Sequence, residues 1–140
     1  MTKIVKEFDV GASIERVYQV VSNPEAWPQW AAFVRAAKRD GRKTHWQYEM
    51  GQMKVESDTI ETVSEKDRVY GFRQASGFLK TGETLLELRA STKGSSVVWT
   101  NQYELPYSYL GKLMDKVKAK RQFEKGMDES IERLKNLLER

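Results

Sequence analysis

The feature that most constrains the fold of this chain is a long C-terminal segment without internal proline that follows a series of short β-strand patterns. After Pro106, the sequence to Arg140 is rich in Lys, Glu, Leu and Met, which favour helix, and Gly126 costs about 1 kcal/mol relative to Ala. A long helix must bury its apolar stripe, and a sheet with one apolar face must bury that face too. We therefore predict an α+β fold in which the sheet wraps around the C-terminal helix.

Apolar and polar residues alternate from about residue 35 to 105, over short runs that turn residues separate. Within HWQYEM, Trp46 and Tyr48 alternate with polar residues, and the preceding Asp40-Gly41 is a two-residue hairpin signal. No helical pattern lies between these runs, which indicates antiparallel pairing. Together with a first strand at 3–10, they predict a seven-stranded antiparallel sheet.

Two short helices are expected between the first and second strands. Ser13 is suited to cap a helix in which apolar residues recur at helical spacing through IERVYQVVS. Asn23-Pro24 then begins a second short helix, which carries Trp27 and Trp30. The expected order is one strand, two short helices, six strands and the long helix, in a single domain over residues 1–140.

The composition excludes several classes of site. The 140 residues include no cysteine, so disulfides, thiolate metal sites and cysteine nucleophiles are excluded. The single histidine, His45, falls on the strand face opposite Trp46, so neither a Ser-His arrangement nor a histidine-rich zinc site is expected. No catalytic residue, metal ligand or cofactor is assigned. No apolar run of about 18 residues occurs, and the expected location is the cytoplasm.

The net charge of +4 is unevenly distributed along the chain. Between Lys112 and Lys125 six basic residues stand against two acidic ones, and a second basic cluster lies between Arg35 and Lys43. These clusters fit either an anionic partner or a solvated helix face and a charged loop. Acidic residues are interleaved with the basic ones and no nucleic-acid-binding motif occurs, so nucleic acid is not an expected partner.

The apolar stripe of the C-terminal helix is interrupted in its middle. Its members are Leu110, Leu113, Met114 and Val117, followed by Met127, Ile131, Leu134 and Leu138. Between these halves, the helix positions that should face the sheet are occupied by Lys120 and Glu124, which are four residues apart on one face. Burying them in a dry core would be costly, so one interpretation is that the middle of the helix lines a cavity or its mouth. The alternative is a slightly rotated helix that turns both residues to solvent.

The strand faces that are expected to point inward are rich in aromatic residues. They carry Trp46, Tyr48, Met53, Phe72, Trp99 and Tyr103, with Gln74 and Asn101 interspersed. Small-molecule sites combine aromatic and aliphatic walls with a few polar groups that orient the ligand. Ordinary core packing produces the same pattern, so both interpretations stay open on the residues alone.

Three segments carry a resemblance to a known superfamily. They are IVKEFDVGASIERVYQVVSNPEAWPQW, VESDTIETVSEKDRVYGFRQASG and SSVVWTNQYELPYSYLGKLMDKV. Through them the whole chain resembles the START, or SRPBCC, superfamily with its helix-grip fold, as a polyketide cyclase/dehydrase-type or coenzyme Q-binding-protein-like member. The resemblance implies a deep cavity between the sheet and the terminal helix. It places Trp30 and Phe33 near the mouth, and it places inside the cavity Trp99, Asn101, Tyr103, Met114 and Val117.

The resemblance also implies that the protein binds or carries a hydrophobic small molecule, such as a lipid, a quinone or a polyketide-like compound. One alternative is a cyclase or dehydrase, for which Lys120, Glu124 and the tyrosines are the candidate acid/base groups. Another is a protein-interaction module, which the basic clusters and the two tryptophans of the second short helix motivate. A carrier would touch a membrane transiently if Phe78 and Leu79 entered it, although this pair also fits packing on a neighbouring strand.

Overall fold

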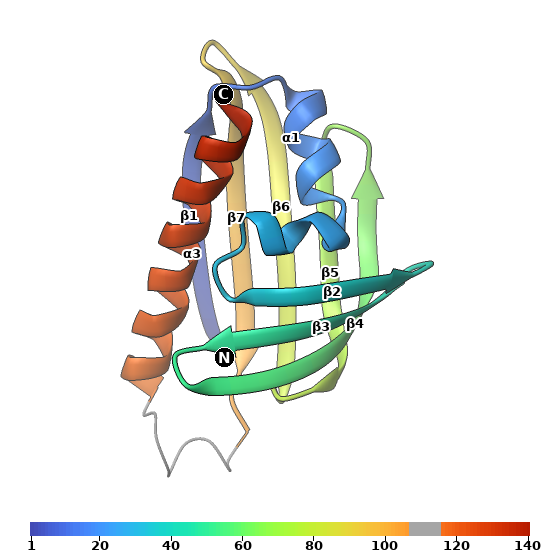
Figure 1. Cartoon of the computed structure of the whole chain (residues 1–140), viewed down its shortest axis with the longest axis vertical. Coiled ribbons are helices and arrows are strands. Elements are labelled where there is room, and N and C mark those ends of the chain that lie inside the picture. The colour runs from blue at the N-terminus through green and yellow to red at the C-terminus, as the bar shows by residue number, and fades with distance from the viewer. Residues whose placement is uncertain (107–115) are drawn as a thin grey trace.

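The fold is built on one curved antiparallel sheet, in a computed structural model that describes residues 1–106 and 116–140. The strand order is β1-β7-β6-β5-β4-β3-β2 (Figure 1). The strands are β1 (Thr2–Val10), β2 (Val34–Asp40), β3 (Lys43–Met50), β4 (Met53–Glu65), β5 (Val69–Gly77), β6 (Thr81–Ser91) and β7 (Gly94–Glu104). This arrangement confirms the predicted seven-stranded sheet.

The alternation of residues along the strands separates the two faces of the sheet. In β3, Thr44, Trp46 and Met50 are buried, whereas His45, Gln47 and Glu49 are exposed, as a period of two requires. The turns on either side of β3 contain Gly41 and Gly51 with φ angles of 63° and 61°. Glycine adopts this left-handed conformation without steric cost, which suits tight hairpin turns.

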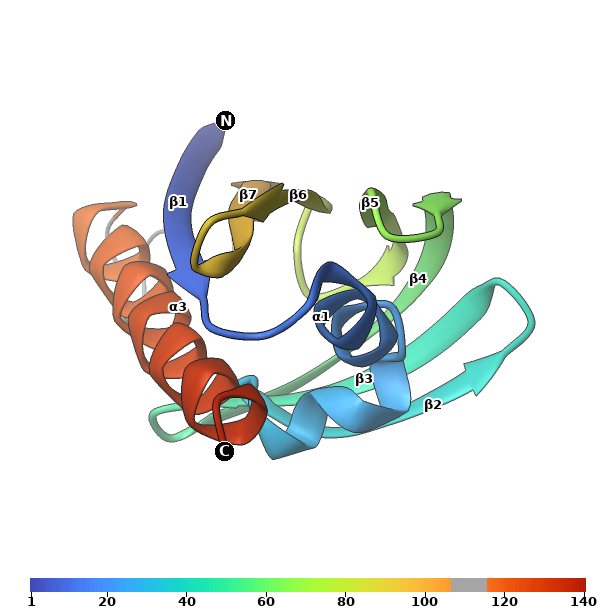
Figure 2. The same cartoon turned by 90° about the horizontal axis from the view of Figure 1, so that it is seen from above.

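Two short helices lie within the curve of the sheet, and α1 is seen there in Figure 2. In α1 (Ile14–Val21) the backbone N–H of Arg16 donates a hydrogen bond to Ser13 Oγ, so Ser13 is the predicted N-cap. The next helix, η1 (Pro24–Gln29), is a 3-10 helix with Asn23 at its N-cap. Both helices occupy the positions that the sequence predicts.

The long helix α3 (Lys116–Leu138) closes the open side of the curve (Figure 2). Asp128 Oδ1 lies 3.2 Å from Lys6 Nζ of β1, and Gly11 N–H donates to Glu139 Oε2 at 2.7 Å. In a third, partly buried connection, the Ala32 N–H donates a hydrogen bond to Ser130 Oγ at 2.8 Å. None of the described helices is both long and apolar enough to cross a bilayer.

The rotation of α3 differs from the predicted one. Val117 is 59% exposed, and the side chains of Lys120 and Glu124 are 50% and 38% exposed. The expectation that Val117 lies inside the cavity is therefore wrong. For Lys120 and Glu124, the alternative of a rotated helix that turns both residues to solvent is the one observed. Lys120 Nζ and Glu124 Oε1 lie 4.0 Å apart at the surface, where water solvates both charges and no desolvation cost arises. Of the predicted stripe, Leu110, Leu113 and Met114 lie outside the described residues.

A different ladder of residues faces the sheet in the first half of the described helix. Ala119 and Met127 are fully buried, and Phe123, midway between them, packs on Tyr103 with ring centroids 4.3 Å apart. Met127 keeps its predicted inward place, and the difference lies in Phe123, whose burial removes more apolar surface from water than burial of Val117 would. This gain, together with the solvation of two charges, explains the observed rotation.

Four tryptophans form the centre of the core. The ring of Trp27 lies 4.6 Å from that of Trp30 and 5.1 Å from that of Trp46, and Trp99 lies 5.6 Å from Trp30. None of the four is more than 2% exposed. The expectation that Trp30 lies near the cavity mouth is therefore wrong, and a protein partner cannot reach Trp27 or Trp30. The segment around η1 places Trp27 and Trp30 inside the curve of the sheet. There they pack against Trp46 and Trp99, and the cluster buries a large apolar area.

Candidate ligand-binding cavity

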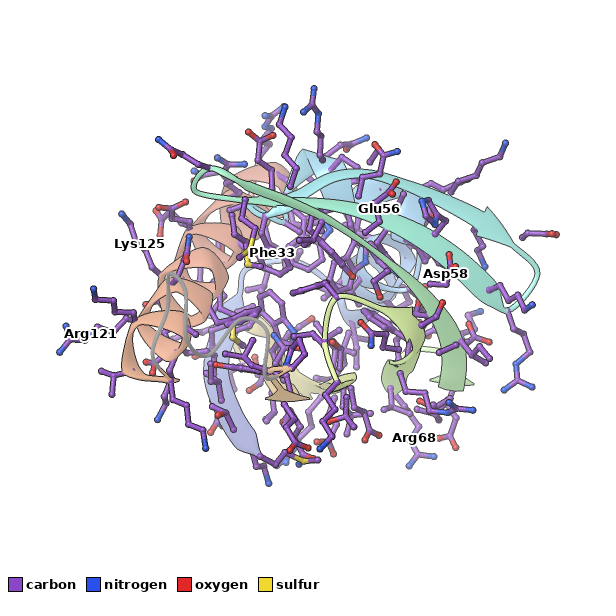
Figure 3. All side chains as sticks on the ribbon, turned by 90° about the horizontal axis from the view of Figure 1, so that it is seen from below. Phe33, Glu56, Asp58, Arg68, Arg121 and Lys125 are labelled. Carbon is purple, nitrogen blue, oxygen red and sulfur yellow. The ribbon has the colours of Figure 1, made fainter. Side chains whose placement is uncertain are left out.

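A cavity lies between the sheet and the N-terminal part of the described α3. Its volume is about 70 Å³. Its wall comes from strands β3 to β7 and the β5–β6 turn, with Trp27 of η1, Phe33 before β2 and Phe123 of α3. Figure 3 views the molecule from this end, with Phe33 between α3 and the β3–β4 side of the sheet.

The wall of the cavity is dominated by rings. The aromatic residues that line it are Trp27, Phe33, Tyr48, Phe72, Phe78, Trp99, Tyr103 and Phe123. Half of the predicted site residues are brought together here, namely Phe33, Tyr48, Phe72, Gln74, Trp99, Asn101 and Tyr103. They converge because the curvature of the sheet turns the same face of each strand toward one volume.

The other predicted site residues lie elsewhere. Trp30 and Trp46 are fully buried in the tryptophan cluster and do not line the cavity. Met53 is half-buried at the β3–β4 hairpin, where Met50, its partner in the ladder, lines the cavity instead. Val117, Lys120 and Glu124 are on the outer side of α3, and Met114 is outside the described residues.

Several lining residues were missed by sequence reasoning, chiefly Phe78, Leu79 and Phe123. Phe78 and Leu79 are half-buried, and the ring of Phe78 lies 5.8 Å from that of Tyr48, so the pair packs on the neighbouring strands. Phe123 is four residues from Ala119 and from Met127, a spacing that could have indicated the true inward stripe. We call Phe33, Phe78, Leu79 and Phe123, which are all half-buried, the rim residues.

Two polar side chains of the wall are engaged by the chain itself. Gln74 Nε2 donates to Leu79 O at 2.7 Å, and Gln74 Oε1 accepts from the Leu79 N–H at 3.3 Å. Gln74 therefore shapes the β5–β6 turn rather than facing a ligand with a free amide. Asn101 Oδ1 accepts a hydrogen bond from Thr84 Oγ1 at 2.7 Å, which leaves its amide N–H groups for other partners.

The indole N–H groups of the tryptophan cluster fall into two classes. Trp27 Nε1 donates to Val21 O at 2.9 Å, and Trp46 Nε1 donates to Thr59 Oγ1 at 2.7 Å. Trp30 Nε1 and Trp99 Nε1 are buried, and neither has a hydrogen-bond acceptor in the described part of the chain. The ring faces around them are at best weak acceptors. A buried donor without an acceptor is costly, and Trp99 belongs to the cavity wall.

The tyrosines of the wall stay protonated at neutral pH. Burial raises the pKa of Tyr48, and burial also raises the pKa of Tyr103, an effect that a weak interaction with Thr2 partly offsets. The Tyr103 hydroxyl makes no well-formed hydrogen bond to the described residues. Both phenols can therefore donate a hydrogen bond but cannot serve as bases. Lys120 and Glu124, the other acid/base candidates, do not face the cavity.

His45 is exposed on the outer face of the sheet, as predicted. Its Nδ1 lies 2.6 Å from Asp58 Oδ1 and its Nε2 lies 3.1 Å from Glu56 Oε1, and Figure 3 shows both carboxylate residues on β4, away from the cavity. These hydrogen bonds, first that to Asp58 and then that to Glu56, raise the pKa of His45. Within residues 1–106 and 116–140 no group of three or more His, Asp or Glu side chains has a geometry that could hold a metal ion.

Comparison with protein families matches residues 1–139 to the family described as "Polyketide cyclase / dehydrase and lipid transport". Comparison with curated proteins gives no match.

Solved structures with a similar fold come from bacteria and plants. A protein from Thermus thermophilus is 20% identical, with a TM-score of 0.82, and the alignment covers 96% of this chain and 95% of that one. A START superfamily protein from Mycobacterium smegmatis is 16% identical, with a TM-score of 0.80 and coverage of 98% and 97%. Major latex-like protein 151 from Panax ginseng is 10% identical, with a TM-score of 0.76 and coverage of 98% and 97%. At these identities the similarity shows the helix-grip fold alone.

Proposed function

Because the chain belongs to the polyketide cyclase/dehydrase and lipid transport family, we propose that it binds and carries a hydrophobic small molecule in the cavity between the sheet and α3. The observation that supports this proposal most is the wall itself, in which aromatic rings surround the space and the buried Trp99 N–H has no acceptor among the described residues. Ligand sites have this character, with apolar walls and a few polar groups that fix orientation.

The proposed ligand is apolar over most of its surface and carries at least one acceptor oxygen. The rings of Phe72 and Trp99 offer flat apolar surfaces. A carbonyl or ether oxygen would satisfy the Trp99 N–H, which otherwise stays unpaired at a cost of about 1–3 kcal/mol. Quinones, polyketide-like compounds and lipids all combine these features.

Binding is expected to enlarge the cavity. The volume of about 70 Å³ is well below the roughly 300–1,000 Å³ that is typical of pockets for small molecules. The side chains of the tryptophan cluster are fully packed and have little room to move. The four rim residues are half-buried and have solvent on one side. We expect the rim residues to move outward while the tryptophans stay in place.

A panel of ligands tests the proposal. Native mass spectrometry of protein purified without detergent should show a bound molecule, and quinones, flavonoids or lipids should raise the melting temperature. Each quinone should be compared with the hydrocarbon that lacks its carbonyl groups, because only the quinone can accept from Trp99. If no compound binds and none shifts the melting temperature, the proposal fails.

A pair of variants on α3 separates binding from stability. Phe123→Ala removes a ring from the cavity wall, and Ile131→Ala removes a half-buried side chain of the same helix that does not line the cavity. Both should lower the free energy of unfolding by roughly 1–3 kcal/mol, less than for a fully buried residue. Only Phe123→Ala should change the affinity for the ligand. Equal affinity of the two variants would remove this cavity from consideration.

A further inference from the structure

Positive charge is concentrated on one part of the α3 surface. Five basic residues precede residue 126 in the described helix, against the single acidic Glu124, whereas the rest of the chain to residue 140 holds four acidic and three basic residues. We call these five the basic face, and they are Lys116, Lys118, Lys120, Arg121 and Lys125. Figure 3 shows Arg121 and Lys125 pointing away from the body of the molecule.

The charges of the basic face are largely available to a partner. No ion pair joins Lys116, Arg121 or Lys125 to another residue of the two described segments. The other basic cluster differs, because Arg39 and Arg42 both pair with Glu61 of β4. Three cations of the basic face, Lys116, Arg121 and Lys125, thus have no ion-pair partner in the described segments, whereas Lys120 pairs with Glu124. These unpaired charges make the first half of the described α3 a positively charged surface.

An exposed apolar residue lies within the basic face. Val117 is 59% exposed and borders an open surface groove. The other residues around this groove include Lys3 of β1 and Lys120 and Arg121 of α3. The groove also contains Met1, which is 77% exposed, and the acidic Glu124. Exposed apolar side chains therefore lie here among residues that are mostly basic.

The basic face adjoins the cavity. Lys116 borders a second surface groove together with Tyr103, and the ring of Tyr103 also lines the cavity and packs on Phe123. In Figure 1 the start of β1, the start of α3 and the β5–β6 turn all lie at the same end of the molecule. A surface that contacts the basic face would therefore be close to the rim residues.

We propose that the basic face and Val117 dock the protein on an anionic lipid bilayer, with the rim of the cavity turned toward the membrane. Cations attract the acidic headgroups, and an apolar side chain among them can enter the boundary between headgroups and acyl chains. Nucleic acid would account for the charges but not for the exposed valine or for the nearby apolar cavity. The proposal concerns the outer surface of α3 and holds whether or not the cavity is occupied.

Vesicle co-sedimentation of the full chain tests this proposal. The protein should bind phosphatidylcholine vesicles that contain about one-third phosphatidylserine, should not bind phosphatidylcholine alone, and should be released by about 0.5 M salt. Arg121→Ala/Lys125→Ala should weaken binding about 30-fold. Lys66→Ala/Arg89→Ala removes the same charge from exposed residues of the β4–β5 turn and the last part of β6, which lie at the opposite end of the molecule in Figure 1, and should leave binding unchanged.

A valine variant separates lipid from other polyanions. Val117→Ser should weaken vesicle binding about fivefold, because the apolar contribution is lost, and should leave retention on heparin unchanged. Both sets of substitutions are at exposed positions, and unchanged melting temperatures would show that the fold is intact. Equal vesicle binding by the Arg121/Lys125 and Lys66/Arg89 double variants would overturn the proposal. So would tighter binding to single-stranded DNA than to vesicles at the same salt concentration.

Discussion

The four tryptophans lie in one cluster but differ in whether their indole N–H groups have a hydrogen-bond acceptor. Trp46 Nε1 donates to Thr59 Oγ1 inside the core, so this ring is held by both packing and a buried hydrogen bond. Trp99 is equally buried, but its N–H has no acceptor among the described residues. Trp46 is therefore a structural residue, whereas Trp99 combines an unpaired N–H with a place in the cavity wall.

Removal of the acceptor for Trp46 should be costly. Thr59→Val keeps the size of the side chain but leaves the buried indole N–H unpaired, so we expect the free energy of unfolding to fall by about 1–3 kcal/mol. Thr59→Ser keeps the hydroxyl and should cost less than Thr59→Val. Urea denaturation of the two variants measures both values. A smaller effect of Val than of Ser would show that the hydrogen bond contributes little.

The His45 ring should titrate above its ordinary value. Its hydrogen bonds to Asp58 and Glu56 raise its pKa from 6.5, and the bond from His45 lowers the pKa of Asp58. The stabilising contribution of the raised histidine is fully present below pH 6.5 and is lost as the pH rises through the folded-state pKa. The contribution of Asp58 is instead lost when the pH falls through its lowered pKa.

An NMR titration of the single histidine measures this shift. Asp58→Asn should move the pKa of His45 back toward 6.5, because the carboxylate that stabilises the imidazolium is gone. Asp40→Asn, which alters an exposed carboxylate that His45 does not contact, serves as the control. A wild-type pKa at or below 6.5 would contradict the observed contacts.

At the scale of elements, α3 contacts the η1–β2 connection through small residues. Ser130 Oγ accepts from the Ala32 N–H and donates to Gly126 O at 2.6 Å, so a buried hydroxyl joins the helix to this loop. One turn earlier, a Cβ at position 126 would lie 3.1 Å from Phe33 Cδ1. Gly126, which weakens the helix locally, therefore provides room for a rim residue of the cavity.

A double-mutant cycle tests this role of Gly126. In the wild-type background, Gly126→Ala gains helix propensity but forces Phe33 to shift, so the change in unfolding free energy should be close to zero. In a Phe33→Ala background the same substitution should stabilise the protein by about 1 kcal/mol. Chemical denaturation of the four proteins gives the coupling energy. Equal effects of Gly126→Ala in both backgrounds would show that Phe33 does not limit this position.

At the scale of the whole molecule, the curved sheet encloses more volume than the tryptophan cluster fills. The cluster occupies the part of the interior near η1, and the cavity of about 70 Å³ is left at the other end, near the start of the described α3. The molecule therefore has a packed half and a half with adjustable side chains. Ligand-induced change is expected in the second half.

Hydrogen exchange should reveal this division. With a saturating ligand, amides near Phe33, in the β5–β6 turn and in the first described turns of α3 should exchange more slowly, because the ligand orders the rim residues. Amides of the β4–β5 turn around Asp67, at the far end of the molecule, should exchange at an unchanged rate. Slower exchange confined to the β4–β5 turn would place the ligand elsewhere.

Local patterns in the sequence determined the elements of this fold. The alternation in HWQYEM, the caps at Ser13 and Asn23 and the proline-free C-terminal segment each reflect interactions between residues close in the chain, which explains why the strands and helices were predicted correctly. The inward faces of the strands followed from the same alternation, so Tyr48, Phe72 and Trp99 were correctly placed inside.

The tertiary structure alone decided how the interior is divided. The rotation of α3 depends on whether Phe123 or Val117 finds more apolar surface on strands that are far away in the sequence. Whether the Gln74 amide is free to bind a ligand depends on the backbone of the β5–β6 turn, to which it is hydrogen-bonded. The size of the cavity depends on four tryptophans that compete for one volume. These outcomes depend on contacts between side chains that are distant in the sequence, and no periodicity along the chain records them.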